Sequence, residues 1–187
     1  MIKRFSSCLL IVVLLFALAS CGDKFDEKKY IGEGLLTRLG ILVDANQTYY
    51  NDVFVMGRLE YDEKTTVKKD GKTYALVTDS IYTTYEALET SLKDVYLEDE
   101  AERILKEYNY YTDIDGKLYI DLSKTEVPTK GHKWVRDRTE QPELEGSGED
   151  FYIIEFYFRD GKSDELDEFK FVNTKKGYRL TVLQEVD

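Results

Sequence analysis

The sequence predicts an α+β domain in which N-terminal helices pack on a curved antiparallel sheet of roughly five to six strands. Three observations predict this fold class. Apolar residues recur at helical spacing over residues 33–55, a helix-capping pattern begins another helical stretch at Thr83, and short alternating runs separated by turn signals fill the chain after residue 110. Helical segments followed by an antiparallel meander indicate helices gathered on one face of a sheet.

The composition is typical of a single globular domain with an acidic surface. The chain has 187 residues, of which 42% are hydrophobic and 34% are charged, and this is too apolar for a disordered protein. The formal net charge is −11 at pH 7. A charge of this sign argues against binding to nucleic acid or anionic lipid through a basic face, so no nucleic-acid partner is expected.

The N-terminal segment has the pattern of a secretory signal. Lys3 and Arg4 precede an apolar run from Leu9 to Leu18, which is shorter than the about 20 residues that a helix needs to span a membrane. The run closes on Leu18-Ala19-Ser20-Cys21. This tetrad resembles the bacterial lipobox, in which the cysteine becomes the lipid-bearing first residue of the mature chain.

The lipobox resemblance implies a lipid-anchored protein on the extracytoplasmic face of the cell membrane. Residues 1–20 are then the signal peptide, residues 21–32 the lipidated Cys21 and a tether, and residues 33–187 a single α+β domain. Acyl chains anchor a protein because each buried CH₂ contributes about 0.8 kcal/mol. Since Cys8 is lost and Cys21 is blocked, neither a disulfide nor a free thiol is expected in the domain. The alternative is an ordinary signal peptide in which Cys21 is incidental.

The first helix is expected over residues 33–55 and should end near Gly57. One face carries a stripe at steps of three and four residues, made by Leu35, Leu39, Leu42, Asn46, Tyr49 and Val53. A hairpin is expected next. Its turn signal, Asp70-Gly71, separates a strand in residues 72–78 from a weaker strand in residues 58–68.

Two more helices and a second hairpin are expected in the middle of the chain. Thr83 matches the first position of a capping box, with a glutamate three residues further on. A short helix should begin at Glu98 or Asp99, because acidic residues are favoured in a first helical turn. Asp115-Gly116 lies between residues 110–114 and 117–122 and is typical of a hairpin turn with positive φ.

The C-terminal third should consist of strands. They are expected in residues 131–138, 151–158, 168–172 and 178–183. The segment 151–158 is apolar and aromatic with Glu155 as its only charge, which marks a central strand. Residues 139–149 are the most loop-like part of the domain.

Residues suited to catalysis or metal binding are scarce. His132 is the only histidine and no cysteine is usable, so neither a zinc site nor a Ser-His-Asp triad is expected. Asp113-Ile114-Asp115-Gly116 begins like a calcium loop but lacks the glutamate at the twelfth position. No catalytic residue, metal, cofactor or enzymatic activity is therefore expected. One exception stays open, a pocket that joins an aspartate to a strand tyrosine such as Tyr152, Tyr157 or Tyr178.

Acidic residues are the remaining functional candidates, and they cluster at residues 98–102, 140–150 and 160–168. Each cluster has an alternative interpretation as a solvated surface. The middle cluster lies in the expected loop, and binding residues are common on loops. We therefore select as partner-binding residues Glu140, Glu143, Glu145, Glu149 and Asp150, with Trp134 as a nearby aromatic. Because the cell wall and membrane are anionic, the partner that such a loop would steer is a basic protein.

The order of features from Tyr74 to Trp134 resembles that of a known family. A strand at 72–76 is followed by the capped helix at 83–88, a second helix at Glu100-Ala101, and the segment Asp115-Gly116-Lys117-Leu118-Tyr119. This order is similar to that of the IseA-type secreted bacterial inhibitors of cell-wall DL-endopeptidases. The resemblance covers residues 33–185. It implies a small dumbbell-like α+β fold whose acidic, loop-borne surface blocks NlpC-type cysteine peptidases.

The expected function is therefore that of a lipid-anchored extracellular protein that inhibits or regulates a cell-wall peptidase. The lipobox departs from the plain signal of the family and would make this a membrane-tethered version. Three alternatives remain open. They are a small-molecule-binding lipoprotein with a cone-shaped α+β fold and an apolar pocket, an enzyme on that cone with a Tyr-Asp pair, and a scaffold or adhesin module without a cleft.

Overall fold

The computed structural model describes residues 31–128 and 133–186. The expected signal peptide, Cys21, the tether up to residue 30 and His132 lie outside these ranges. Within them, no helix is both long and apolar enough to cross a membrane. The residues from Ile31 onward form one structural unit, which is the domain described below.

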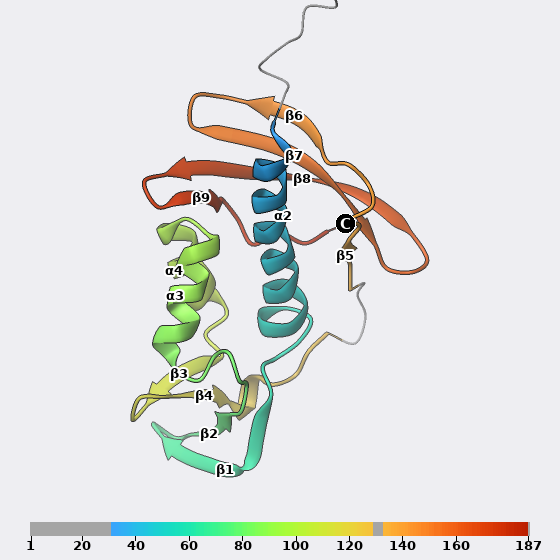
Figure 1. Cartoon of the computed structure of the whole chain (residues 1–187). Coiled ribbons are helices and arrows are strands. Elements are labelled where there is room, and N and C mark those ends of the chain that lie inside the picture. The colour runs from blue at the N-terminus through green and yellow to red at the C-terminus, as the bar shows by residue number, and fades with distance from the viewer. Residues whose placement is uncertain (1–30, 129–132, 187) are drawn as a thin grey trace, which may run out of the picture. The chain divides into compact units, whose positions relative to one another are not determined.

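Among the described residues the α-helices all end by Glu107, with β1 and β2 between the first and the second of them, and strands dominate the rest of the chain (Figure 1). The helical elements are α2 (Glu33–Thr48), the π-helix η2 (Tyr49–Phe54), α3 (Tyr85–Val95), α4 (Glu98–Glu107) and the 3-10 turn η3 (Leu122–Lys124). The strands are β1 (Tyr61–Lys69), β2 (Lys72–Val77), β3 (Tyr111–Ile114), β4 (Lys117–Asp121), β5 (Val135–Arg136), β6 (Glu143–Ser147), β7 (Phe151–Arg159), β8 (Asp164–Thr174) and β9 (Gly177–Leu180). The α+β class expected from the sequence is confirmed.

The described strands form two antiparallel sheets, where the sequence predicts a single one. The smaller sheet has four strands in the order β1-β2-β4-β3, and the larger has five, in the order β5-β7-β8-β9 with β6 also paired to β7. The helices α2, α3 and α4 lie between the two sheets (Figure 1). This position explains the division, because the helices keep the first two hairpins away from the strands that follow residue 133.

Two hairpin turns have the geometry that their sequences predict. Asp70 and Gly71 have φ angles of 51° and 76°, and Asp115 and Gly116 have φ angles of 53° and 76°. Two successive residues with positive φ are characteristic of the type I′ turn, whose twist matches that of the flanking strands. These turns fix the registers of β1 with β2 and of β3 with β4.

The first helix changes its winding near its end. The α-helix stops at Thr48, and residues 49–54 continue as a π-helix. The helical segment ends before Gly57, as expected, and at this residue a Cβ would lie only 2.6 Å from the Asn51 carbonyl oxygen. The Arg58 guanidinium then caps the helix by donating to the Phe54 carbonyl oxygen at 2.8 Å.

The capping threonine of α3 is Thr84, so the prediction of Thr83 was wrong by one residue. Thr84 Oγ1 accepts a hydrogen bond from the Ala87 backbone N–H at 3.0 Å. The backbone of Thr83 has a different role, since its carbonyl oxygen accepts from the Leu118 N–H of β4 at 3.3 Å. A tertiary contact with the smaller sheet therefore decides which of two adjacent threonines caps the helix.

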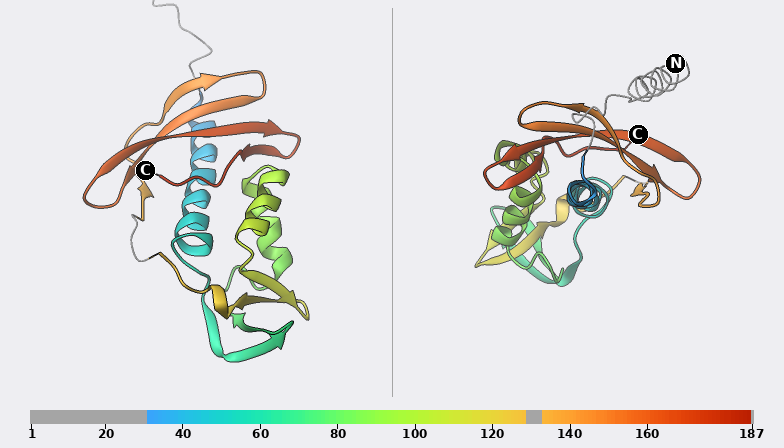
Figure 2. Two further views of the ribbon diagram at one scale, coloured as in Figure 1. Left: turned by 180° about the vertical axis from the view of Figure 1, so that it is seen from behind. Right: turned by 45° about the horizontal axis from the view of Figure 1, so that its top comes forward.

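The inner face of the larger sheet is filled by aromatic and aliphatic side chains. They are almost fully buried and comprise Ile154, Phe156, Phe158, Phe169 and Phe171. Phe156 meets Phe169 and Phe171 edge-on at centroid distances of 6.0 and 6.1 Å, a favourable geometry for aromatic rings. Figure 2 shows this sheet curving over the helices, and the same core cluster includes Leu39, Val43 and Leu92.

Candidate functional site

The acidic segment expected to be a loop is partly a strand. Residues 143–147 form β6, which pairs antiparallel with β7. The strand forms because the short alternation Glu143-Leu144-Glu145 directs Leu144 inward opposite Ile154 and leaves both glutamates exposed. A bulge between Leu144 and Gly146 then shifts the register. The prediction of a loop across 139–149 was therefore wrong for its second half.

Three glutamates from three adjacent strands stand in one row on the outer face of the larger sheet. Glu143 of β6 is directly opposite Glu155 of β7, and Glu155 is directly opposite Glu168 of β8. We call these three residues the glutamate row. Glu145 lies beside it, since one carboxylate oxygen from each of Glu143, Glu145 and Glu155 can be chosen so that all lie within 4.8 Å of one another.

The electrostatics of the glutamate row are unfavourable for the fold. Partial burial raises the pKa of Glu155, and the charges of Glu145 and Glu143 raise it further. Tyr157 Oη donates to Glu143 Oε1 at 3.1 Å, and this bond raises the pKa of the Tyr157 hydroxyl. Like charges directly opposite each other destabilise a sheet. A row of this kind does not contribute to stability, and we therefore consider it as a binding feature.

Apolar side chains flank the glutamate row on the same outer face. They are Phe151 and Ile153 of β7 and Leu166 and Val172 of β8. Lys170 shares this face but is engaged, with its Nζ 4.9 Å from the centre of the Phe151 ring. Arg159, also on this face, is bonded to Asp164 at 2.8 Å. The outer face thus combines partly exposed apolar surface with glutamates (Glu143, Glu145, Glu155 and Glu168) that form no salt bridge within the part of the chain that the structure describes.

The other selected acids lie at the two ends of the β6–β7 hairpin. Glu140 precedes β6 and approaches Arg159 at 4.0 Å. Glu149 and Asp150 are exposed in the turn that joins β6 to β7. The structure therefore brings Glu143 and Glu145 together with Glu155 and Glu168, while Glu140, Glu149 and Asp150 extend the negative charge along the hairpin.

Trp134 does not lie on the outer face. Its side chain is only 6% exposed and belongs to the core, and its carbonyl oxygen accepts a hydrogen bond from Asn51 Nδ2 at 3.2 Å. The selection of Trp134 as an aromatic beside the acidic surface was wrong. The physical reason is that Trp134 packs against the helical segment that carries Asn51, which lies far away in the sequence.

A polar cavity of about 590 Å³ lies between α2 with η2 and the segment around β5. Its wall is held by Arg136, whose guanidinium makes two hydrogen bonds with the Asp44 carboxylate, at 2.8 Å and 3.0 Å. Gln47, Asn51, Trp134 and Arg138 also line it. We call it the Arg136 cavity. No sequence pattern pointed to it, because Gln47 and Asn51 fall outside the apolar stripe of the first helix.

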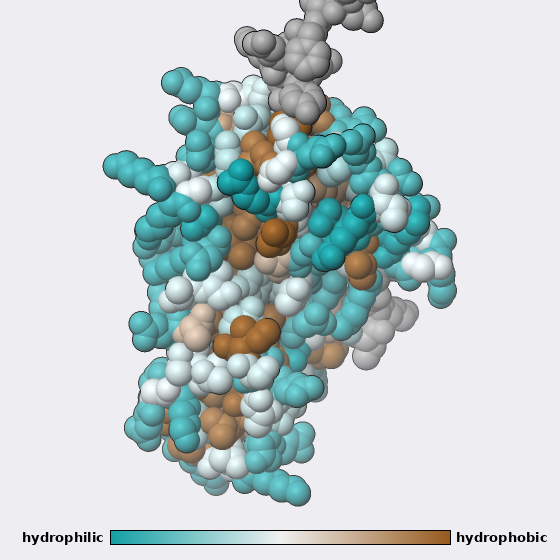
Figure 3. Space-filling view, in the orientation of Figure 1, coloured by the Kyte–Doolittle hydropathy of each residue, from teal (hydrophilic) through white to brown (hydrophobic). Residues whose placement is uncertain are grey.

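The apolar pocket expected of a small-molecule-binding cone is not formed by the sheet that the structure describes. The concave face of the larger sheet is filled, with Phe156 and Phe158 almost completely buried beneath it. On the face of the molecule that is in view, Figure 3 shows hydrophobic residues (brown) only as small separate patches. The Arg136 cavity, by contrast, is lined mainly by charged and amide side chains.

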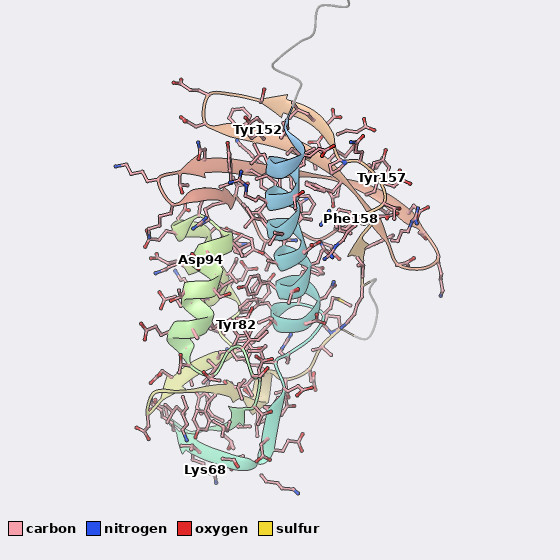
Figure 4. All side chains as sticks on the ribbon, viewed as in Figure 1. Lys68, Tyr82, Asp94, Tyr152, Tyr157 and Phe158 are labelled. Carbon is pink, nitrogen blue, oxygen red and sulfur yellow. The ribbon has the colours of Figure 1, made fainter. Side chains whose placement is uncertain are left out.

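Among the described residues, no hydrogen bond joins Tyr152, Tyr157 or Tyr178 to a buried carboxylate. Figure 4 shows Tyr152 well apart from Tyr157 along β7. The rings of Tyr152 and Tyr178 are 5.7 Å apart and pack on each other. Tyr157 does meet a carboxylate, that of Glu143, but on the outer face. A raised pKa keeps the Tyr157 hydroxyl protonated near neutral pH, which disfavours a role for it as a general base.

Sequence reasoning missed Glu168 as part of the site, and it noted Glu155 only as the single charge of a central strand. A signal was present, because Glu155 alternates with the inward-facing Ile154 and Phe156.

Comparison with known proteins adds no constraint. No protein-family model matches the chain, and a search of curated proteins finds no match. The function must therefore be inferred from the site itself.

Proposed function

We propose that this chain is a lipid-anchored extracytoplasmic protein that binds and inhibits a basic cell-wall peptidase of the NlpC type through the outer face of its larger sheet. The observation that carries the proposal is the glutamate row, Glu143, Glu155 and Glu168, in direct register across three strands. Neither the partner nor the anchor is part of the described structure, and both are inferences from the residues.

The first support is that the glutamate row lowers the stability of the free protein. Its carboxylates repel one another, and the pKa of Glu155 is raised by partial burial first and by the neighbouring carboxylates second. A cationic partner would relieve the repulsion on binding, so that interaction energy absent from the free protein would be gained in the complex. The net charge of −11 would also steer a basic protein toward the domain.

The second support is the apolar surface around the row. Phe151, Ile153 and Leu166 lie on the same face, and Leu166 is 44% exposed. Charge alone gives speed and specificity of association, whereas buried apolar and aromatic side chains supply most of the affinity of protein interfaces. The outer face offers both.

The third support is the family resemblance. The IseA-type inhibitors are described by a dumbbell-like α+β fold, and here two sheets are separated by helices (Figure 1). In that family the inhibitory surface is acidic and borne by a loop. In this chain two of the acidic residues selected as partner-binding, Glu143 and Glu145, lie on an edge strand that continues into an exposed turn.

The test is an inhibition assay. The chain from residue 22 to 187 is mixed with an NlpC-type peptidase and peptidoglycan, and muropeptide release is measured. We expect slowing at micromolar excess of the domain, and the slowing should weaken as salt rises because exposed charges are screened. Combined Glu143→Gln, Glu145→Gln and Glu155→Gln substitutions should reduce the apparent affinity about tenfold or more.

A matched control removes equal charge elsewhere. Glu98→Gln, Asp99→Asn and Glu102→Gln alter the first cluster, on α4, and should leave inhibition unchanged. Equal loss of inhibition in both triple variants would mean that only the overall charge matters and would contradict a specific role for the outer face. No slowing by the unmodified domain at micromolar excess would remove the proposal.

A further inference from the structure

The Arg136 cavity has the size and the walls of a ligand site that shares no residue with the glutamate row. Its volume of about 590 Å³ lies within the range of known small-ligand pockets. Arg136 is held in the wall of the cavity, because its side chain is only 13% exposed and is paired with Asp44. The guanidinium carbon lies 5.7 Å from the centre of the Phe156 ring, and both of its bonds to Asp44 have good length.

Two residues that line this cavity each carry a buried amide atom for which the described part of the chain offers no hydrogen-bond partner. Gln47 and Asn51 are each 7% exposed, and among the residues that the structure describes nothing is hydrogen-bonded to Gln47 Nε2 or Asn51 Oδ1. The orientation of the Asn51 amide is fixed, because its Nδ2 donates to the Trp134 carbonyl oxygen. Buried polar atoms are normally paired, so an unpaired donor and acceptor at one cavity point to a ligand that supplies both bonds.

The donor and acceptor character of these atoms indicates the chemistry that would satisfy them. Gln47 and Asn51 are four residues apart at the junction of α2 with η2, and both line the cavity. One offers an N–H donor and the other a carbonyl acceptor. The complementary group is an amide, whose C=O would accept from Gln47 and whose N–H would donate to Asn51.

The charges of the cavity select further among ligands. Its lining carries as many aspartates as arginines (Asp44, Asp52 and Asp137 against Arg136, Arg138 and Arg159), and this balance disfavours a polyanion such as a nucleotide. Arg138 stands at the rim with a side chain that is 73% exposed. Only one of its nitrogens is bonded to Asp44, at 2.9 Å, so further N–H groups can receive a single carboxylate.

We propose that the Arg136 cavity binds a short peptide with a free terminal carboxylate. The peptide amide pairs with Gln47 and Asn51 on the floor, and the carboxylate pairs with Arg138 at the rim. This site is independent of the proposed peptidase-binding face, since it uses none of the residues of the glutamate row. It gives the protein a second activity, recognition of a small peptide.

The single tryptophan of the chain is a reporter for this site, because Trp134 lines the cavity. The full chain in detergent micelles is titrated with N-acetyl-alanyl-alanine and with its C-terminal amide, and tryptophan fluorescence is recorded. We expect a saturable change for the free acid at millimolar concentrations or below, and binding of the amide about tenfold weaker because it lacks the charge-assisted bond to Arg138.

Two variants separate the parts of the site. Arg138→Met should weaken binding of the free acid about tenfold and abolish its advantage over the amide. Gln47→Leu keeps a similar volume but removes the floor donor, and it should weaken both peptides. The control is Lys162→Met, in the exposed turn between β7 and β8, which should change neither affinity.

The results that would overturn the proposal are equally direct. One is the absence of a saturable fluorescence change with either peptide up to about 10 mM, a concentration at which weak specific binding is still detected. The other is equal affinity for both peptides in the unsubstituted chain and in Arg138→Met. The triple variant of the outer face should bind the peptides normally, so failure of the inhibition assay leaves this test intact.

Discussion

Asn46 and Gln184, which are 138 residues apart in the sequence, are joined by two hydrogen bonds. Asn46 Nδ2 donates to the Gln184 carbonyl oxygen at 2.8 Å, and Asn46 Oδ1 accepts from the Gln184 backbone N–H at 3.0 Å. The same Oδ1 accepts from Tyr96 Oη at 3.0 Å. A side chain of α2 therefore pairs with the C-terminal segment in the way that a neighbouring strand would.

Asn46→Ala should destabilise the domain by about 2–4 kcal/mol. The substitution leaves the Gln184 N–H and C=O and the Tyr96 hydroxyl without their partner in a buried place, and each unsatisfied group costs about 1–3 kcal/mol before relaxation. Urea unfolding measures the change. Asn173→Ala, at an exposed position of β8, is the matched control, and an equal effect at both positions would contradict the central role of Asn46.

Asp44 and Arg136 should be strongly coupled, and the coupling should depend on Gly40. Asp44→Asn or Arg136→Met is expected to cost about 1–3 kcal/mol, because the partner is left partly buried and unpaired. A Cβ at position 40 would lie 2.9 Å from Arg136 Cζ, so Gly40→Ala should displace the guanidinium from Asp44.

The measurement is a double-mutant cycle for Asp44 and Arg136, in the natural background and with Gly40→Ala. We expect a coupling energy of about 1 kcal/mol or more in the first background and close to zero in the second. A coupling that persists in the Gly40→Ala background would show that the helix surface does not need glycine to seat the guanidinium.

Asp121 should make stability depend on acid pH. Its side chain is only 2% exposed and lies 2.9 Å from Lys72 Nζ. Burial raises the pKa of the carboxyl, but hydrogen bonds from Lys72 and Ser123 outweigh that effect, and the pKa lies below its ordinary value of 3.8. The ionised form is therefore favoured by folding, and the stabilisation is present above pH 3.8 and lost as the pH falls through the folded-state pKa.

Asp121→Asn should accordingly cost about 1–2 kcal/mol at pH 7, a modest figure because Lys72 is largely solvated. The difference from the unsubstituted domain should vanish below the folded-state pKa. Urea unfolding between pH 2 and pH 7 follows it. Asp115→Asn, in an exposed turn where asparagine tolerates positive φ, should change little at any pH.

Glu155 should act in the opposite sense. Its pKa is raised above the ordinary value of 4.5 by partial burial and by Glu145 and Glu143. The protonated form is therefore favoured by folding, and its contribution is present below pH 4.5 and lost as the pH rises through the folded-state pKa. Glu155→Gln should make the domain more stable at pH 7 by up to about 1 kcal/mol.

The gain should shrink toward pH 4, where Glu155 itself is protonated. Glu63→Gln, at an exposed position of β1, serves as the control for simple loss of charge. If Glu155→Gln destabilised the domain at neutral pH, the inference that the glutamate row is held at a cost would be wrong.

Cys21→Ser should release the protein from the membrane. The substitution removes the thiol that the lipobox resemblance assigns to the diacylglycerol thioether, and without acyl chains the membrane affinity falls steeply. Incorporation of labelled fatty acid and fractionation of membranes measure the outcome. Cys8→Ser lies inside the expected signal peptide and should leave both acylation and membrane association unchanged.

Local sequence patterns predicted most of the helices and turns. Tertiary contacts decided the exact cap of α3 and the division of the strands into two sheets. Asp115-Gly116 identified its turn because two successive positive φ angles restrict the residue choice. Thr84 replaced Thr83 as a cap because β4 engages the Thr83 carbonyl oxygen. The division into two sheets was also beyond local patterns, since alternation marks a strand but not its neighbours.

The site was predictable only in part for the same reason. The exposure of Glu143 and Glu145 follows from their alternation with Leu144. Their alignment with Glu155 and Glu168 depends on the registers of two hairpins. Gln47 and Asn51 lie off the apolar stripe of the first helix, and only the packing of Trp134 and Arg136 makes a cavity there.

The two hydrogen bonds between Asn46 and Gln184 also limit when folding of the domain can be completed. A newly made chain holds Asn46 first, and its partner Gln184 follows only 138 residues later. The same holds for Glu100 of α4, whose Oε1 accepts a hydrogen bond from the Leu183 backbone N–H at 2.7 Å. The contacts that join α2 and α4 to the C-terminal segment can therefore form only after residues 183 and 184 have been synthesised.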